Sequence, residues 1–242
     1  METYEIAADL HCHTVASAHA YSTVAELAAA AHAKGLKAIA VTDHGPALQD
    51  GAPLVHFTNL RILPHEINGV RVLQGAEANV VDFAGNLDLN QVCFDRLEWI
   101  IASFHEDVIA PGTAEQHTHA YEKLAENPYI DVIGHSGTEC FPYDYERLIP
   151  IFGEKKKLVE INNHTFLVRS DSQKNCRRIA LLCKQYGVPV VVSTDAHFAG
   201  EVGEVSQAMQ MLHEIDFPSE LIVNRNMDAL LRRLSERKNA LG

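Results

Sequence analysis

The sequence has few cationic and aromatic side chains, and it has no long apolar run. Twenty Lys and Arg residues stand against 32 Asp and Glu residues, which gives a formal net charge of −12, and only 7% of the residues are aromatic. Long nucleic acids are bound through their phosphates by clustered Lys and Arg. The longest apolar runs are about the length of a strand, well below the ~20 residues of a membrane span. We therefore expect neither long nucleic acid nor a membrane as a partner.

Cysteine is scarce, and its pattern is uninformative. The five cysteines are odd in number and form no Cys-x-x-Cys pair. A disulfide framework is not expected in a chain this long and apolar. The opening Met-Glu-Thr-Tyr-Glu contains no basic segment followed by an apolar stretch, so we expect no signal peptide. These features predict a reduced, cytoplasmic protein.

Linkers, repeats and glycine-rich phosphate loops are also missing. No Gly-x-Gly-x-x-Gly motif follows the first apolar run, which argues against a nucleotide cofactor. The 242 residues, 47% of them hydrophobic, fit either one large α/β barrel or two small domains. Because no boundary interrupts the pattern, we expect one domain over residues 1–242.

Short apolar runs alternate with amphipathic segments along the whole chain. The runs are continuous rather than alternating, which is typical of parallel strands covered on both faces. The expected strands are 6–10, 38–42, 70–75, 99–104, 130–134, 158–161 and 189–194. The expected helices are 24–34, 117–126, 175–186, 205–214 and 227–238, with a short one near 57–63. The pattern predicts a seven-stranded (β/α) barrel, with an open doubly wound sheet as the alternative.

Six of these seven strands end on a residue that binds metals well. In a parallel barrel all such ends lie on one rim, so residues far apart in sequence converge there. His11 and His13 are two apart in an extended segment and therefore share a face. Imidazoles with a few carboxylates suit Zn²⁺, Mn²⁺ or Fe²⁺ better than Mg²⁺ or Ca²⁺. The metal-binding candidates at strand ends are His11, His13, His44, Glu77, His105, His135, Asp195 and His197.

Two further histidines lie near strand ends. His19 is in the loop after His11 and His13, and His164 follows the sixth strand. The spacing alone assigns neither of them to the site.

Seven motifs resemble those of the PHP (polymerase and histidinol phosphatase) superfamily of metal-dependent phosphoesterases. The resemblance is closest to the small stand-alone bacterial members of that superfamily. They are DLHCHTVASAHAYST (9–23), AVTDHGP (40–46), QGAEAN (74–79), IIASFHE (100–106), VIGHSG (132–137), EINNHTF (160–166) and STDAH (193–197). The resemblance covers nearly the whole chain and implies a distorted seven-stranded PHP-type barrel with three divalent metal ions. The first metal would bind His11, His13, Glu77 and Asp195; the second Glu77, His105 and His135; the third His19, His44 and His197.

A metal-bound hydroxide is the expected nucleophile, and a small phosphomonoester is the expected substrate. No serine or cysteine nucleophile is then needed. Arg61 and Arg169 are the candidates for clamping the phosphate. A homo-oligomer is compatible with the sequence. Alternatives are a phosphodiesterase or nuclease of the same family, a histidinol-phosphate phosphatase, an amidohydrolase and a metal-binding interaction module without catalysis.

Overall fold

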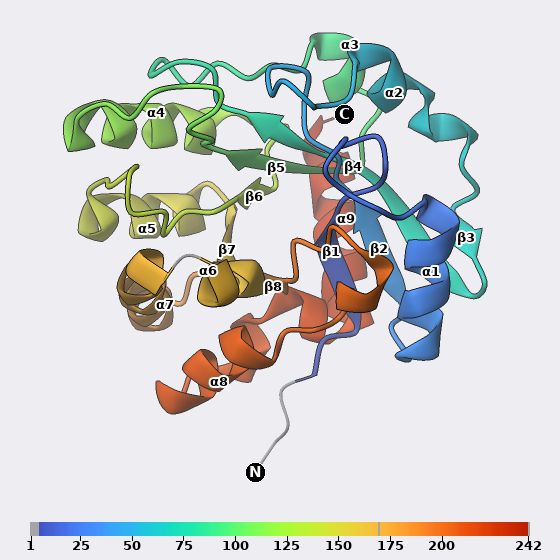
Figure 1. Cartoon of the computed structure of the whole chain (residues 1–242). Coiled ribbons are helices and arrows are strands. Elements are labelled where there is room, and N and C mark those ends of the chain that lie inside the picture. Colours follow the sequence, from blue (N-terminus) through green and yellow to red (C-terminus); the bar gives the residue numbers. More distant parts are fainter. Residues whose placement is uncertain (1–4, 169, 242) are drawn as a thin grey trace.

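A computed structural model describes residues 5–168 and 170–241. In this part of the chain, seven parallel strands form one sheet at the centre, and helices surround it (Figure 1). The strands are β1 (Ala8–Cys12), β2 (Ala38–Val41), β4 (Val70–Asn79), β5 (Trp99–Ser103), β6 (Val132–Ile133), β7 (Leu158–Asn162) and β8 (Val190–Ser193). They are neighbours in this order. A short strand, β3 (Glu66–Ile67), pairs antiparallel with the start of β4.

Helices connect the strands and cover the outside of the sheet. They are α1 (Val24–Ala33), α2 (Leu54–Asn59), α3 (Gln91–Phe94), α4 (Ala114–Glu126), α5 (Tyr145–Glu154), α6 (Asn163–Val168), α7 (Gln173–Tyr186), α8 (Ser206–Glu214) and α9 (Met227–Leu241). Short 3₁₀ turns occupy Leu60–Ile62, Ser170–Ser172, Ala199–Glu201, Ser219–Leu221 and Val223–Arg225. Helix α1 begins at a capping box formed by Thr23 and Glu26, which satisfies amide groups that the first helical turn leaves free.

The sheet curls into a nearly closed barrel, and polar groups join its two edges. An isolated parallel bridge links Cys12 with Ala196, the latter just beyond β8. The buried Asn224 side chain donates hydrogen bonds to the carbonyls of Ala8 (2.7 Å) and Val192 (2.6 Å) and accepts one from the Val192 amide (3.1 Å). Asp9 of β1 accepts hydrogen bonds from Thr194. These contacts hold β1 beside β8.

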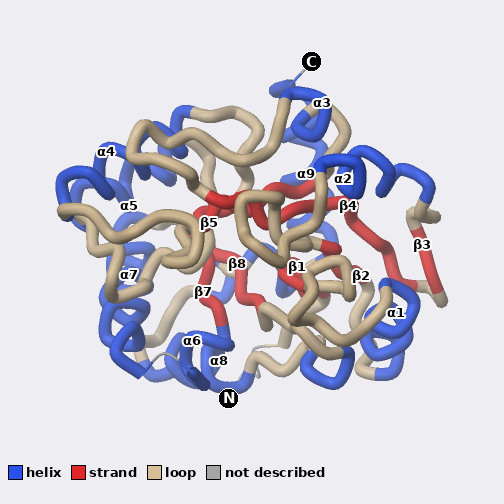
Figure 2. The backbone as a smooth tube through the Cα atoms, turned by 45° about the horizontal axis from the view of Figure 1, so that its top comes forward, coloured by secondary structure: helices blue, strands red, loops and turns tan. Residues whose placement is uncertain are grey.

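Apolar side chains fill one end of the barrel. The interior cluster contains residues from the first part of several strands, including Ala8, Ala38, Trp99 and Leu158, together with Leu230 of α9. Helix α9 runs behind the strands in Figure 1 and covers this amino-terminal end. The opposite, carboxyl-terminal end is therefore the one left for a site, and Figure 2 shows loops crossing the strands in the centre while helices lie around them.

The expected barrel is confirmed, and the open-sheet alternative is wrong, because β1 and β8 lie side by side. Each expected strand corresponds to a strand of the structure, and β4 continues four residues beyond the expected end at Gly75. Helices α3, α5 and α6 and strand β3 were not expected. Helix α5 contains Pro150, and proline disfavours helix interiors. The burial of other side chains of the helix, such as Leu148 and Phe152, outweighs that local preference. No helix in the described residues combines the length and the apolar character needed to cross a membrane.

We expect Asn224→Leu to destabilise the fold by about 3 kcal/mol or more, because buried backbone groups of β1 and β8 lose a hydrogen-bond partner. Urea unfolding measures the change. Asn239→Leu, at an exposed position of α9, is the matched control and should stay within about 0.5 kcal/mol of the parent. Equal stability of the two variants would contradict the conclusion that the Asn224 hydrogen bonds hold β1 beside β8.

Candidate metal centre

The nine residues expected to bind metals lie together at the carboxyl ends of the strands. His11 is in β1 and Glu77 is in β4, while the others follow their strands in loops. Six of them are buried, His105 and His197 are partly exposed, and His19 has 44% of its side chain exposed. The loops after β1, β2, β5, β6 and β8 supply His13, His19, His44, His105, His135, Asp195 and His197.

An irregularity in β1 aims its histidines. Leu10 packs inside the barrel, whereas Cys12 belongs to the outer core between sheet and helices. Strict alternation would put these two side chains on the same face. The β1–β2 ladder shifts register between Asp9 and Cys12, and such bulges re-aim side chains. Cys12 faces the core, where burial raises the pKa of its thiol well above the usual range.

Four donor atoms form a compact first group. Nε2 of His13 lies 3.1 Å from Oδ1 of Asp195 and 3.6 Å from Oε2 of Glu77. Nε2 of His11 lies 3.5 Å and 3.4 Å from the same two oxygens. Ligands held tetrahedrally at about 2.1 Å from a zinc ion are separated by roughly 3.4 Å. The four imidazole–carboxylate distances are therefore close to the ligand spacing around one metal ion, and donor atoms of His11, His13 and Asp195 all lie within 4.8 Å of one another.

The second oxygen of Glu77 faces a different pair of imidazoles. Oε1 lies 3.4 Å from Nε2 of His105 and 3.2 Å from Nε2 of His135. Nε2 of His135 is also 3.4 Å from Oδ2 of Asp195. Each oxygen of the Glu77 carboxylate thus belongs to a different set of donors, an arrangement that fits a bridge between two cations.

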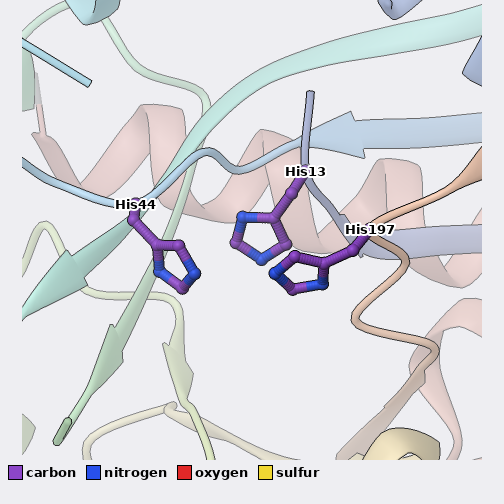
Figure 3. A group of neighbouring side chains, drawn as sticks. All are labelled: His13, His44 and His197. Atoms are coloured by element: carbon purple, nitrogen blue, oxygen red, sulfur yellow. The ribbon is translucent and has the colours of Figure 1, made fainter. Parts of the chain in front are cut away.

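A third group of imidazoles lies toward solvent. Nε2 of His19 and Nε2 of His197 are 2.8 Å apart. In Figure 3 the rings of His13, His44 and His197 reach a common space from separate segments, and their donor atoms are close enough to hold one ion. Nδ1 of His44 also lies 2.7 Å from Oε2 of Glu77. His13 and His44 therefore lie between the groups, and geometry alone does not divide them uniquely.

The donor atoms at the centre have no hydrogen-bond partner within the described protein. They are buried, and such atoms cost free energy when they are left unpaired. Divalent cations fit this set because carboxylate oxygens and imidazole nitrogens are their usual ligands. The atoms are Nε2 of His11 and His13, Nδ1 of His44, both carboxylate oxygens of Glu77 and Oδ1 of Asp195.

Electrostatics keep the central acids ionised. Burial would favour the neutral acid, but nearby imidazoles, His11 foremost, hold the pKa values of Glu77 and Asp195 well below their usual ranges. Burial and the charge of His44 lower the pKa of His13 to about 3, so His13 is neutral at pH 7. Burial opposes protonation of His11, yet the charges of Glu160, Glu77 and Asp195 raise its pKa well above the usual value. A cation binding at His11 would displace this proton.

Acceptors behind the imidazoles fix which nitrogen faces the centre. Nδ1 of His11 donates to Glu160 (2.6 Å), and Nδ1 of His105 donates to the side-chain oxygen of Asn79 (2.7 Å). Nδ1 of His197 is bonded to the Asp195 carbonyl (2.8 Å). Nδ1 of His19 is bonded to Asp50. In each ring Nε2 is therefore the nitrogen that faces the other donors, the orientation that metal-binding histidines require.

Sequence reasoning missed these supporting acceptors. Glu160 also accepts hydrogen bonds from the Ser193 hydroxyl (2.6 Å) and the His135 amide (2.8 Å), so it joins three strand ends. Its signal was a lone acidic residue inside the apolar run 158–161. Asn79 could have been found as the residue two positions after Glu77, on the same face of β4. Asp50 lies in a long loop and carried no such signal.

Two residues at this rim have a left-handed backbone conformation, which non-glycine residues seldom adopt. They are His135 (φ 46°) and Asp195 (φ 58°). Both turn the chain sharply directly after a strand. Backbone strain of this kind concentrates at functional sites, where the surrounding structure holds it in place.

A cavity of about 690 Å³ opens above the donors. Its described lining includes no Lys or Arg, and besides the candidate metal ligand Asp195 four acidic residues, Glu106, Asp107, Glu139 and Asp171, lie along it. Of the two expected phosphate clamps, Arg61 is exposed in the turn Leu60–Ile62 and is not among these lining residues. Arg169 lies outside the described residues.

Similar solved structures share this fold. A histidinol phosphate phosphatase from Lactococcus lactis, complexed with zinc, L-histidinol and phosphate, aligns with a TM-score of 0.63 at 17% identity, covering 88% of this chain and 92% of that one. A chain in a structure of archaeal ribonuclease P with mature tRNA aligns with a TM-score of 0.59 at 14% identity, covering 96% and 91%. At these identities the likeness concerns the fold alone.

Sequence relatives are much closer. A probable phosphatase of Acetivibrio thermocellus is 43% identical over 232 residues, 95% of this chain and 96% of that protein. A probable phosphatase of Caldicellulosiruptor bescii is 41% identical, covering 92% and 93%. The PHP domain model matches residues 9–164, and the PHP-associated model matches residues 173–239. The donors of six strand ends lie together on one rim, and relatives of this similarity match the chain along its length; the chain belongs to the PHP domain family.

Proposed function

We propose that this protein is a metal-dependent phosphatase that hydrolyses small-molecule phosphomonoesters at a site for three divalent metal ions. That it is a hydrolase of phosphate esters follows from its family and from its probable-phosphatase relatives. One observation carries the finer proposal. The buried Glu77 carboxylate has no hydrogen-bond partner within the described residues, and its two oxygens face different sets of imidazoles.

The proposed assignment gives each metal at least three protein ligands. Zinc suits the donors best, and manganese or iron are the alternatives. His11, His13, Glu77 and Asp195 would hold the first ion, Glu77, His105 and His135 the second, and His19, His44 and His197 the third. Spacing supports the first two sets most directly, since their imidazole nitrogens lie 3.1–3.6 Å from their carboxylate oxygens.

Divalent metals bound here would supply Lewis-acid stabilisation of phosphoryl oxygens and lower the pKa of the attacking water. The chain's own residues hold the site in shape for this chemistry. Glu160 orients His11, and Asn79 orients His105, so each ring presents Nε2. Asp43 accepts hydrogen bonds from Thr14 and Ser17, which fixes the loop between His13 and His19.

The surroundings favour a small substrate over a nucleic acid. The cavity of about 690 Å³ is confined to the barrel rim, and its described lining offers acidic rather than basic side chains beyond the metal donors. A protein of net charge −12 gives a polyanion no basic stripe to follow. The phosphate would instead be attracted by the bound cations at the floor.

We also propose that residues 1–242 act as one domain. The two family matches meet between residues 164 and 173, yet β7 and β8, which lie on either side of that boundary, pair through four aligned residues. The second match thus contributes β8 and, with Asp195 and His197 after it, part of the candidate site.

Removal of metal should abolish activity. The metal-replete protein should hydrolyse at least one phosphomonoester in a panel that includes histidinol phosphate, with slower turnover of diesters. Treatment with a chelator should stop the reaction, and added zinc or manganese should restore it. Activity on diesters alone would favour a phosphodiesterase, and full metal content with no turnover of any ester would favour a non-catalytic module.

Glu77→Gln should reduce metal content by two ions per chain, because one carboxylate serves two sets of donors. Elemental analysis of purified, metal-offered protein measures this directly. Glu154→Gln, an exposed substitution at the end of α5, should retain the parent content. A loss of a single ion from Glu77→Gln would refute the bridging assignment.

Glu160→Gln should weaken metal binding by about 10- to 100-fold, as expected when the partner of a metal-binding histidine is altered. The amide nitrogen must face one of the three donors that Glu160 now accepts from, and His11 loses its ionised partner. Metal affinity is measured by competition with a chromogenic chelator, with Glu154→Gln again as the control. Unchanged affinity would show that Glu160 does not position His11.

A further inference from the structure

His164 lines the cavity but belongs to none of the candidate metal-binding groups. It is the second residue of α6, directly after β7, and it is partly buried. Its ring centroid lies 6.2 Å from that of His197. It is thus beside the metal centre, on the wall that a bound substrate would contact.

Hydrogen bonds on both sides hold the backbone of His164 in place. Its amide donates to the side-chain oxygen of Asn162 (2.9 Å), and the Asn162 amide group donates to Oδ2 of Asp195 (3.3 Å). The side-chain oxygen of Asn163 accepts from the Ala208 amide (2.9 Å), which ties α6 to α8. Both flanking asparagines are buried. The position of His164 is therefore fixed relative to Asp195.

The ring itself is not tied down in the same way. Within residues 5–168 and 170–241, no hydrogen bond to the imidazole of His164 is formed, whereas His11 and His105 each have a carboxylate or amide acceptor at Nδ1. Histidines that bind metals nearly always have such an acceptor. The fixed backbone and the uncommitted ring fit a group that contacts substrate rather than metal.

Other polar groups on this wall are poor donors. Thr138 already donates its hydroxyl to the His135 carbonyl (2.8 Å), and Ser172 is only 3% exposed to solvent. A leaving alkoxide develops negative charge and needs a donor. The acidic side chains along the cavity, which accept rather than donate when ionised, are Glu106, Asp107, Glu139 and Asp171.

We propose that His164 donates a hydrogen bond to the leaving-group oxygen of the phosphate ester, a role that rests on the proposed phosphatase function. The oxygen of water forms the new bond to phosphorus, and the old P–O bond breaks with its electron pair on the leaving oxygen. One proton of the water ends on the alcohol and the other on phosphate. The His164 N–H stabilises the charge on the leaving oxygen as that bond breaks.

Leaving-group dependence tests this role. We expect His164→Ala to lower kcat/KM by about 100-fold for ethyl phosphate, whose alkoxide needs stabilisation, and by less than about threefold for 2,4-dinitrophenyl phosphate, whose phenoxide does not. His164→Gln, which retains an N–H donor, should recover part of the ethyl phosphate activity. His32→Ala, at an exposed position of α1, should change neither rate.

Metal content separates this role from ligation. Elemental analysis of His164→Ala should match the parent; a lost ion would make His164 a ligand and overturn the inference. Equal losses on both esters would also overturn it, because a general binding or structural role does not depend on the leaving group. If the parent protein hydrolyses both esters but His164→Ala leaves the ratio of their kcat/KM values unchanged, the proposed function stands and the role of His164 is refuted. If the metal-replete parent hydrolyses neither these two esters nor any member of the panel, both proposals fail.

Discussion

Glu77 holds a carboxylate at the centre of the rim where neither oxygen has a hydrogen-bond partner within the described residues. Burying a charge in this way is unfavourable unless opposite charge accompanies it. The surrounding imidazoles depress the pKa of the acid, and two of them, His105 and His135, lie near one oxygen while His11 lies near the other. The spacing of these donors matches that of metal ligands, so bound cations would compensate the buried negative charge.

Closure of the barrel is what assembles this environment. His11 in β1 and Asp195 after β8 are separated by most of the chain, yet their donor atoms lie 3.5 Å apart. That contact requires β1 and β8 to lie side by side, which Asn224 and Asp9 enforce through buried hydrogen bonds. The hydrogen bonds that join β1 to β8 thus shape the site from outside it. The apolar cluster under α9 fills the amino-terminal end of the barrel, so the site lies at the opposite end.

Much of the site could be inferred from the chain alone, because ligand-type residues follow apolar runs at six strands. The structure brings those residues together with His19, which the family resemblance, not spacing, had added. The supporting acceptors were less visible. Glu160 and Asn79 act through contacts across neighbouring strands, and a single sequence does not display which side chains face each other there. Arg61, which the sequence suggested as a phosphate clamp, is exposed and is not among the described residues that line the cavity.

The sequence by itself determined the order of strands and helices, the parallel sheet and the placement of ligand-type residues at strand ends. These features depend on local apolar patterning. Tertiary structure decided which donors share a cation-sized space, because that depends on barrel closure and on the bulge in β1 between Asp9 and Cys12. It also decided the protonation of the imidazoles and the exposure of His164 to the cavity. Those properties arise from burial and from neighbours distant in sequence, and no local pattern encodes them.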